Sequence, residues 1–265
     1  MVTLGLALLA TATIGDWKLI WSDEFDRPGR PDPKKWTFEN GFVRNREHQW
    51  YQPENAFVQD GKLIIEARRQ SKPNPAFDPK RDEWWAKREK IEYTSASLKT
   101  QGLQSFLYGR FEMRGKIDTR LGMWPAWWTL GVDKEWPSSG ELDILEFYRG
   151  QLLANAAWGT RQQYVGQWKT EIRKIESFND PKWSEKFHTW RMDWSPTEIV
   201  MSVDDVVMNR VDLSKTLNPD GFNPFQQPHY MLLNLAIGGD NGGDPANTTF
   251  PARFEVDWVR VFSKR

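Results

Sequence analysis

The chain has 265 residues with 36 basic and 36 acidic side chains, so its formal net charge is zero. A neutral chain lacks the basic surplus that nucleic-acid binding requires, and we expect no nucleic-acid partner. Because there is no cysteine, disulfides and thiolate metal sites are excluded, and the three histidines are too far apart for a zinc motif. The length is sufficient for one large domain with a sizeable core.

The first twelve residues (MVTLGLALLATA) are apolar and end in an A-x-A-like cleavage pattern, although they lack the positive residues that usually open a signal peptide. They predict a signal-peptide remnant over residues 1–15 and a secreted or periplasmic protein. A truncated gene start and an ordinary N-terminal strand are the alternatives. Twelve residues cannot span a bilayer, and no other apolar run is long enough, so we expect no membrane partner.

From Trp17 onward, short β-prone segments alternate with turn residues, a pattern typical of an all-β sandwich or barrel. The clearest segments are 62–67, 109–117, 124–130, 198–203, 229–237 and 254–262. A short helix is expected near Leu213–Leu217. No repeat or linker divides the chain, so we predict one domain over residues 16–265.

Residues 70–92 interrupt the strand pattern, because they are rich in proline and charge and contain Trp84 and Trp85. One interpretation is a solvated surface loop. The other is a loop beside a binding cleft that adds an aromatic platform.

The chain contains 16 tryptophans, more than a core usually needs. Flat indole faces suit the apolar faces of sugar rings. On a strand, Trp124, Ala126 and Trp128 share one face, with Pro125 and Trp127 on the other. One of these faces is expected in the core, and the other could line a groove.

The segment 138–148 (SSGELDILEFY) alternates acids with large apolar residues. Glu141 and Asp143 share a strand face, and a one-residue β-bulge would bring Glu146 onto it. Across such a bulge the two glutamates have Cα atoms roughly 13 Å apart, and leaning side chains bring the carboxyls to about 6 Å, near the ~5–5.5 Å of a retaining glycosidase pair. On spacing alone, a polar edge strand or a metal site remains an alternative.

The segment around these acids, WPSSGELDILE at 136–146, resembles the active-site strand of glycoside hydrolase family 16. Further matches occur in chain order at 21–25 (WSDEF), 93–96 (YTSA), 108–112 (YGRFE), 122–128 (GMWPAWW), 234–239 (NLAIGG) and 256–261 (VDWVRV). The resemblance implies a jelly-roll sandwich of two antiparallel sheets with a concave substrate cleft, and a catalytic domain over residues 16–265.

The resemblance also implies a mechanism by three acids. Glu141 is expected to attack the anomeric carbon, and Glu146 to protonate the leaving oxygen and later deprotonate water. The charge of Glu141 should raise the pKa of Glu146. Asp143 is expected to hydrogen-bond Glu141 and to modulate its charge.

By resemblance, Trp124, Trp128 and Trp136 are expected to line the sugar-binding cleft. Asn45, in the segment NREHQWY, is expected to bind a sugar hydroxyl on the non-reducing side. The alternative for Asn45 is a polar group that stabilises its loop.

One position departs from the family. Many laminarinase-like members carry a histidine where this chain has Ala157. This departure affects contacts to the reacting sugar, and Asn155 or Trp158 is expected to substitute.

Glu24, Gly61 and Asp257 occupy positions at which family members bind a structural calcium ion, and carboxylate and carbonyl oxygens suit this ion. The alternative is that the two carboxylates pair with arginine or lysine. No cofactor is expected for catalysis.

Together these features predict a monomeric, retaining endo-hydrolase of β-1,3- or mixed β-1,3-1,4-glucan. An endo-hydrolase of a marine galactan, such as an agarase or carrageenase, is the alternative within the enzymes. A non-catalytic glycan-binding jelly roll and a structural β-sandwich are the alternatives outside them.

Overall fold

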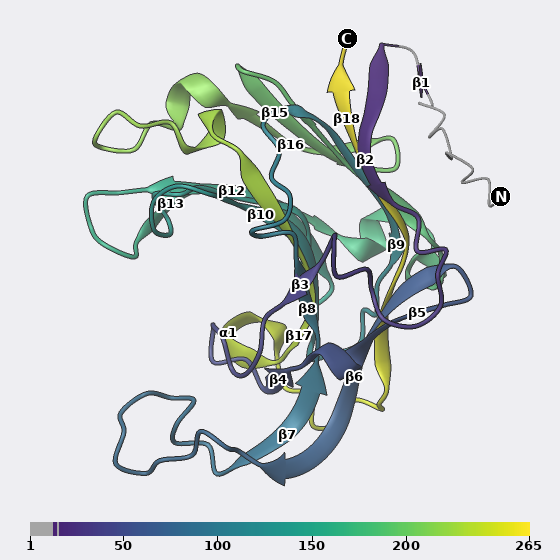
Figure 1. Cartoon of the computed structure of the whole chain (residues 1–265), viewed down its shortest axis with the longest axis vertical. Coiled ribbons are helices and arrows are strands. Elements are labelled where there is room, and N and C mark those ends of the chain that lie inside the picture. Colours follow the sequence, from purple (N-terminus) through teal and green to yellow (C-terminus); the bar gives the residue numbers. More distant parts are fainter. Residues whose placement is uncertain (1–12, 15) are drawn as a thin grey trace, which may run out of the picture.

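The computed structural model describes residues 13–14 and 16–265. The predicted signal-peptide remnant therefore lies outside the described residues, apart from the backbone of Thr13 and Ile14. These two residues form β1 (Thr13–Ile14), which pairs with β2 (Trp17–Asp23). β2 in turn pairs with the C-terminal strand β18 (Ala252–Lys264), so the two ends of the described chain lie side by side (Figure 1).

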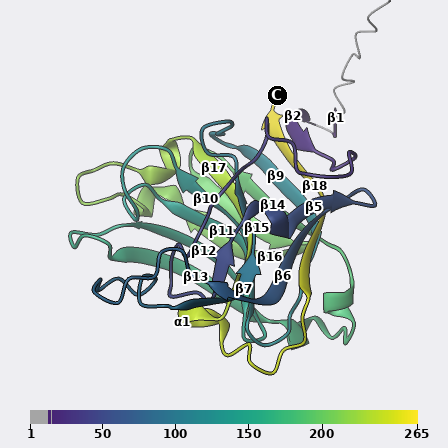
Figure 2. The same ribbon diagram turned by 60° about the horizontal axis from the view of Figure 1, so that its bottom comes forward.

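Two curved sheets pack face to face (Figure 1, Figure 2). In the larger sheet the strand order is β16 (Val206–Asp212), β15 (Glu198–Val203), β14 (His188–Trp194), β9 (Gly109–Lys116), β18, β6 (Lys62–Pro73), β7 (Lys90–Ser95) and β4 (Gln49–Tyr51). In addition, β2 pairs with β18, and β5 (Ala56–Gln59) pairs with β6. In the smaller sheet the strand order is β13 (Gly166–Lys174), β12 (Gln151–Gly159), β11 (Glu141–Tyr148), β10 (Met123–Gly131), β17 (His229–Ile237), β8 (Ser97–Lys99) and β3 (Thr37–Phe38).

Among the described strands every pairing is antiparallel except that of β4 with β7, which is parallel. The predicted all-β sandwich of two sheets is therefore confirmed, with one parallel pair at an edge of the larger sheet. The predicted short helix is a 3₁₀ turn at Leu213–Lys215. The other helical segments are the α-helical turn α1 (Gly239–Gly242) and 3₁₀ turns at Pro53–Asn55, Ile175–Phe178, Trp183–Glu185 and Pro224–Gln226.

The core fills the space between the sheets because alternate residues of each strand point inward. β10 illustrates this alternation: Trp127 is fully buried in the main core, whereas Ala126 and Trp128 belong to a separate cluster on the opposite face. The predicted division of this tryptophan-rich strand into a core face and a groove face is thus confirmed. In the part of the chain that the structure describes, no helix is long and apolar enough to cross a membrane.

Candidate active site

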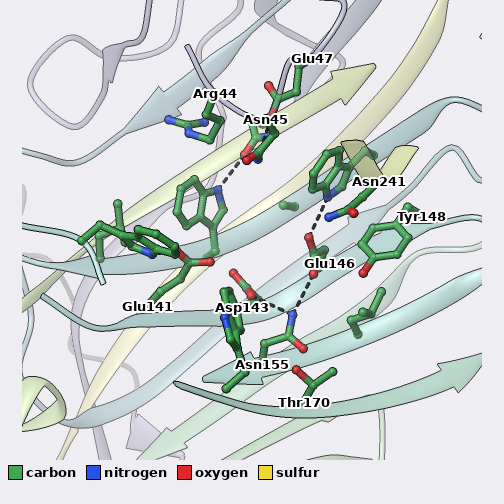
Figure 3. Close-up of a pocket in the computed structure, with 18 of the residues that line it drawn as sticks. Arg44, Asn45, Glu47, Glu141, Asp143, Glu146, Tyr148, Asn155, Thr170 and Asn241 are labelled. Atoms are coloured by element: carbon green, nitrogen blue, oxygen red, sulfur yellow. Dashed lines mark hydrogen bonds between the residues drawn. The ribbon is translucent and has the colours of Figure 1, made fainter. Parts of the chain in front are cut away.

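A cavity of about 600 Å³ lies on the face of the smaller sheet that points away from the core (Figure 3). The strands that line it supply Trp124, Ala126, Trp128, Leu130, Glu141, Asp143, Glu146, Tyr148, Leu153, Asn155, Trp168, Thr170, Ile172 and Asn234. Loops and α1 add Arg44, Asn45, Glu47, Trp136 and Asn241. The cavity therefore combines acids and amides with an aromatic lining.

The predicted β-bulge is present in β11. The register between β10 and β11 skips Ile144, because Asp143 and Leu145 pair with consecutive residues of β10. The register with β12 shifts at the same place. The extra residue returns Glu146 to the face of Glu141 and Asp143, and all three acids line the cavity.

Glu141 begins β11 directly after Gly140. Only glycine fits there, because φ is +80° and a Cβ would stand 2.7 Å from Pro224. The indole Nε1–H of Trp136 donates to Oε2 of Glu141 at 2.7 Å. Burial and the charge of Glu146 raise the pKa of Glu141 to about 7, while the hydrogen bond from Trp136 opposes the rise.

Asp143 is 5% exposed and lies between the two glutamates. The side-chain Nδ2 of Asn155 donates to its Oδ2 at 2.9 Å. Burial and the charge of Glu141 hold the pKa of Asp143 well above its usual range. A protonated Asp143 donates a hydrogen bond to Glu141, which stabilises the Glu141 carboxylate.

Glu146 is held from two sides. Trp124 donates from Nε1 to Oε1 at 2.8 Å, and Asn155 donates from Nδ2 to Oε2 at 2.8 Å (Figure 3). Burial raises the pKa of Glu146 to about 8, and Asp143 adds to this rise when it is ionised. The predicted rise in the pKa of Glu146 is therefore present, with burial as its first cause and Asp143 as a further acidic neighbour.

Trp128 is fixed by a chain of hydrogen bonds that ends at Glu47, another residue of the cavity lining. Its Nε1 donates to Oδ1 of Asn234 at 2.7 Å, Asn234 donates to the hydroxyl of Tyr51 at 3.1 Å, and this hydroxyl donates to Glu47 at 3.2 Å. The guanidinium of Arg44 lies 5.1 Å from the centroid of the Trp128 ring. Trp128 therefore lines the cavity in a fixed orientation, with the guanidinium of Arg44 over its ring.

Asn45 is exposed and has φ of +53°, a left-handed conformation that asparagine tolerates well. Its Nδ2 donates to Oε1 of Glu47 at 3.2 Å. Burial raises the pKa of Glu47, while the charge of Arg44 and a hydrogen bond from Gln49 oppose the rise. Asn45 lines the cavity, as predicted, and its side chain also helps to hold the loop.

The structure does not place Trp158 in the cavity. On β12, Asn155 and Ala157 share the cavity face, so Trp158 points to the opposite face, where it packs against the main core. Ala157 pairs with Glu141 across the sheet and is fully buried. Of the two residues predicted to substitute for the missing histidine, Asn155 therefore reaches the acids and Trp158 does not.

Three residues that were not predicted from the sequence line the cavity from the edge strand β13: Trp168, Thr170 and Ile172. The signal that could have found them is alternation: these residues are neutral, whereas those between them in GQWKTEIRK are mostly charged. Arg44 and Asn241 were not predicted either, because Arg44 lies in an irregular segment and Asn241 in the four-residue turn α1, both too short of regular structure for a period to mark the buried side.

Residues 70–92 support the loop that carries Asn45, and none of them lines the cavity. Arg88 donates to the main-chain oxygens of Arg46, at 2.7 Å, and Glu47. Its guanidinium also lies 4.8 Å from the Trp84 ring centroid. Of the two interpretations, the structure favours a surface loop, which also supports the loop that carries Asn45.

The carboxylates of the predicted calcium site are engaged by arginines. Glu24 receives two hydrogen bonds from Arg260, at 3.0 and 2.7 Å, and Asp257 pairs with Arg114. Burial alone would raise the pKa of Glu24, but Arg260 holds it below its ordinary value. Among the described residues, no group of three or more acids or histidines could hold a metal ion. Both carboxylates are thus paired with arginine, as in the alternative to calcium.

Comparisons with known proteins agree on one family. The family model of the glycosyl hydrolases family 16 matches residues 44–260. A β-glucanase of Rhodothermus marinus is 36% identical over 93% of this chain and 85% of its own length. The laminarinase catalytic domain of Thermotoga maritima superposes with a TM-score of 0.79 at 31% identity, covering 95% of this chain and 100% of that domain. A structure from a study of endo-acting O-glycanases of the human gut microbiota has a TM-score of 0.86 at 32% identity, with 95% and 92% covered.

Proposed function

This chain belongs to the glycosyl hydrolases of family 16, and from that premise we propose that it is an endo-acting, retaining hydrolase of β-1,3- or mixed β-1,3-1,4-glucan. One observation carries the proposal: Glu141, Asp143 and Glu146 share one cavity face because of the bulge in β11. The substrate class is supported by the names of relatives, a β-glucanase and a laminarinase.

In the first step, the Glu141 carboxylate attacks the anomeric carbon of the sugar as the glycosidic C–O bond breaks. Glu146 gives its proton to the leaving oxygen, which departs as a hydroxyl. The raised pKa of Glu146 keeps this proton in place near neutral pH. The products of this step are a glycosyl ester on Glu141 and an ionised Glu146.

In the second step, Glu146 takes a proton from water, and the oxygen of that water attacks the anomeric carbon. The bond to Glu141 breaks, and the anomeric configuration of the substrate is restored. Hydrogen bonds from Trp136 and from protonated Asp143 stabilise the Glu141 carboxylate as it leaves. Two carboxyl groups account for both steps, so we assign no cofactor to the chemistry.

Both glutamates have raised pKa values, about 7 for Glu141 and about 8 for Glu146, because both are buried. The hydrogen bond from Trp136 favours the ionised form of Glu141, which suits a nucleophile.

A second candidate is endo-hydrolysis of a mucin O-glycan. The observation that favours it is the TM-score of 0.86 with the structure from the O-glycanase study, against 0.79 for the laminarinase. The remaining alternative, a glycan-binding jelly roll without activity, would not need a pair of glutamates with raised pKa values.

One experiment separates these candidates. The protein is incubated with laminarin, mixed-linkage β-glucan, agarose, carrageenan and mucin O-glycans, and the products are sized by chromatography, with Glu141→Gln as the inactive control. We expect oligosaccharides of several lengths from laminarin or mixed-linkage glucan. Cleavage of agarose, carrageenan or O-glycans alone would replace the glucan proposal, and no cleavage of any glycan would leave a binding module.

We also propose that the protein is a secreted or periplasmic monomer, with residues 1–15 as a signal-peptide remnant and 16–265 as the catalytic domain. Apolar residues before an A-x-A-like pattern support the location. N-terminal sequencing of protein recovered from the medium or periplasm, and its elution volume on gel filtration, test these statements. A structural calcium at Glu24, Gly61 and Asp257 is not part of the proposal, because arginines engage both carboxylates.

A further inference from the structure

The loop that carries Trp136 lies between two strands of the smaller sheet and has no strand of its own. It spans residues 132–140, between β10 and β11, and is called the Trp136 loop below. Inside it, the main-chain N–H of Ser139 donates to the carbonyl of Glu135 at 3.0 Å. Such a local bond shapes a turn but does not fix its position relative to the sheet. The indole must nevertheless hold its place, because its bond to Glu141 is 2.7 Å long.

A segment distant in the sequence contacts both ends of the Trp136 loop. This segment, residues 213–228, joins β16 to β17. Its Gln227 is 4% exposed and accepts a hydrogen bond from the main-chain N–H of Asp133 at 2.8 Å. The same side chain donates to the main-chain oxygen of Ser139 at 2.8 Å. One buried amide thus connects the beginning of the loop with its end.

Asn218, from the same segment, connects the Trp136 loop to the neighbouring strand β12. It is 4% exposed, and its Nδ2 donates to the main-chain oxygen of Ser138 at 2.8 Å. Its Oδ1 accepts from the N–H of Gly159, the last residue of β12, at 2.7 Å. The residue two positions after Trp136 is therefore attached to the strand that pairs with the catalytic strand β11.

The contact between the loop and the 213–228 segment is close. A Cβ on Gly131, the residue just before the loop, would stand 2.3 Å from Nε2 of Gln227, so no larger side chain fits there without displacing the amide. Buried amide groups of this kind satisfy main-chain groups that no strand pairs. The two side chains therefore supply the order that a sheet would otherwise give this loop.

We propose that Asn218 and Gln227 position the indole of Trp136 for its hydrogen bond to Glu141 by holding the loop that carries it. Neither amide lines the cavity, so both are positioning residues and not catalytic ones. The charged and titratable groups that act on Glu141 lie outside the 213–228 segment and remain in place when either amide is substituted: Glu146, Asp143, Arg44 and Tyr230. The relevance to catalysis rests on the proposed role of Glu141 as nucleophile.

The test measures the ionisation of Glu141 in the whole protein. Glutamates are labelled with ¹³C at the side-chain carboxyl, and the NMR signal of Glu141 is identified by its loss in Glu141→Gln. For Asn218→Ala and Gln227→Ala we expect the titration midpoint of Glu141 to rise by about 0.5 to 1 pH unit, since the indole donor that favours the carboxylate is displaced. Gln227→Met keeps the volume of the side chain without its hydrogen bonds, and it should show the same shift.

Activity on laminarin provides the second readout. In the same variants kcat/KM should fall about three- to tenfold at pH 6 and stay within about twofold of the wild type at pH 9. Combination with Trp136→Phe, which lacks the indole donor, shows whether the effect passes through Trp136. In that background, Asn218→Ala and Gln227→Ala should move the midpoint by less than about 0.2 pH unit, because residues that act through one bond are not additive.

The matched control is Asn223→Ala. Asn223 is a buried amide of the same segment, but it donates to the main-chain oxygen of Leu213 at 2.7 Å and accepts from the N–H of Phe225 at 3.0 Å, both within residues 213–228. Its loss should lower the melting temperature and leave the midpoint of Glu141 unchanged. Melting curves verify that every variant has folded.

Three results would overturn the proposal. An unchanged midpoint in Asn218→Ala and Gln227→Ala would show that the loop holds Trp136 without them. An equal shift in the Trp136→Phe background would show that they act on Glu141 by another route. The same shift in Asn223→Ala would indicate general loosening of the segment. If the wild type cleaves no glycan, the proposed function fails, while the NMR titration still decides whether the two amides position Trp136.

Discussion

The hydrogen bond between Trp136 and Glu141 gives a prediction that separates sugar stacking from acid chemistry. The sequence predicts Trp136 only as a residue of the sugar-binding cleft. In the structure its Nε1–H also donates to Glu141 at 2.7 Å and opposes the rise of the Glu141 pKa. Trp136→Phe keeps an aromatic face and removes the donor, so its effect reports on the hydrogen bond.

The magnitude follows from the strength of such bonds. A hydrogen bond to a charged group contributes roughly 1.5–3 kcal/mol, and one pKa unit corresponds to about 1.4 kcal/mol. Because Trp136 is half-buried, we take the lower end, about one unit, which raises the pKa of Glu141 from about 7 to about 8. The acid limb of the pH–rate profile then moves to higher pH and meets the alkaline limb set by Glu146.

The expected signature is asymmetric. With limbs at about 7 and 8 in the wild type and both at about 8 in the variant, kcat/KM falls about tenfold at pH 6 and is nearly unchanged at pH 9. Trp136→Ala should show the same shift and, in addition, a KM raised by up to about tenfold, since a stacked ring contributes about 1 kcal/mol. The assay is release of reducing sugar from laminarin between pH 5 and 10.

A matched control is Trp85→Phe, because Trp85 lies in the 70–92 loop and does not line the cavity. Its pH profile should equal that of the wild type. If Trp136→Phe keeps the wild-type acid limb, or loses activity equally at every pH, then the Trp136 hydrogen bond does not set the ionisation of Glu141.

Four further outcomes are expected. Glu141→Gln and Glu146→Gln should each lower kcat by several orders of magnitude while the variants stay folded; more than a few per cent of activity in Glu141→Gln would contradict its role as nucleophile. NMR of the first turnovers should show retained anomeric configuration, and inversion would exclude the two-step mechanism. The folded-state pKa values of Glu141 and Glu146 lie above their unfolded values, so the stability that their protonation supplies is complete below about pH 4 and is lost as the pH rises through about 7 and 8. Glu146→Gln should therefore raise the melting temperature at pH 9 relative to the wild type, with a smaller gain or none at pH 5; equal shifts at both pH values would refute this linkage. Finally, calcium and chelator should leave the melting temperature unchanged, because arginines engage Glu24 and Asp257; a rise with calcium that Asp257→Ala removes would restore the calcium site.

Much of the catalytic strand could be predicted from the sequence because its information is local. The alternation of side chains along a strand depends only on the backbone, so Glu141 and Asp143 had to share a face. The apolar pair Ile144 and Leu145 could both be buried only if the strand carried an extra residue, which predicted the bulge before Glu146. The same reasoning correctly divided the faces of the tryptophan-rich strand β10.

The pairing of distant segments could not be predicted in this way. Trp158 and Trp168 are both tryptophans of short β-prone segments, and only the register of β12 and β13 determines that Trp168 faces the acids while Trp158 faces the core. Likewise, the donors to Glu141 and Glu146 come from residues 5 and 22 positions away. Their geometry is a property of the assembled sheet.

The charges depend on tertiary structure for the same reason. The sequence by itself determined which side chains can ionise, and it predicted that Glu146 would hold its proton. Only the structure shows that burial is the first cause of the raised pKa of Glu146 and that Asp143 is the acid beside it. Only the structure shows, too, that Arg260 and Arg114 pair with the acids predicted to bind calcium. A pKa depends on solvent exclusion and on charges within a few ångströms. Both are fixed only when strands far apart in the chain have packed together.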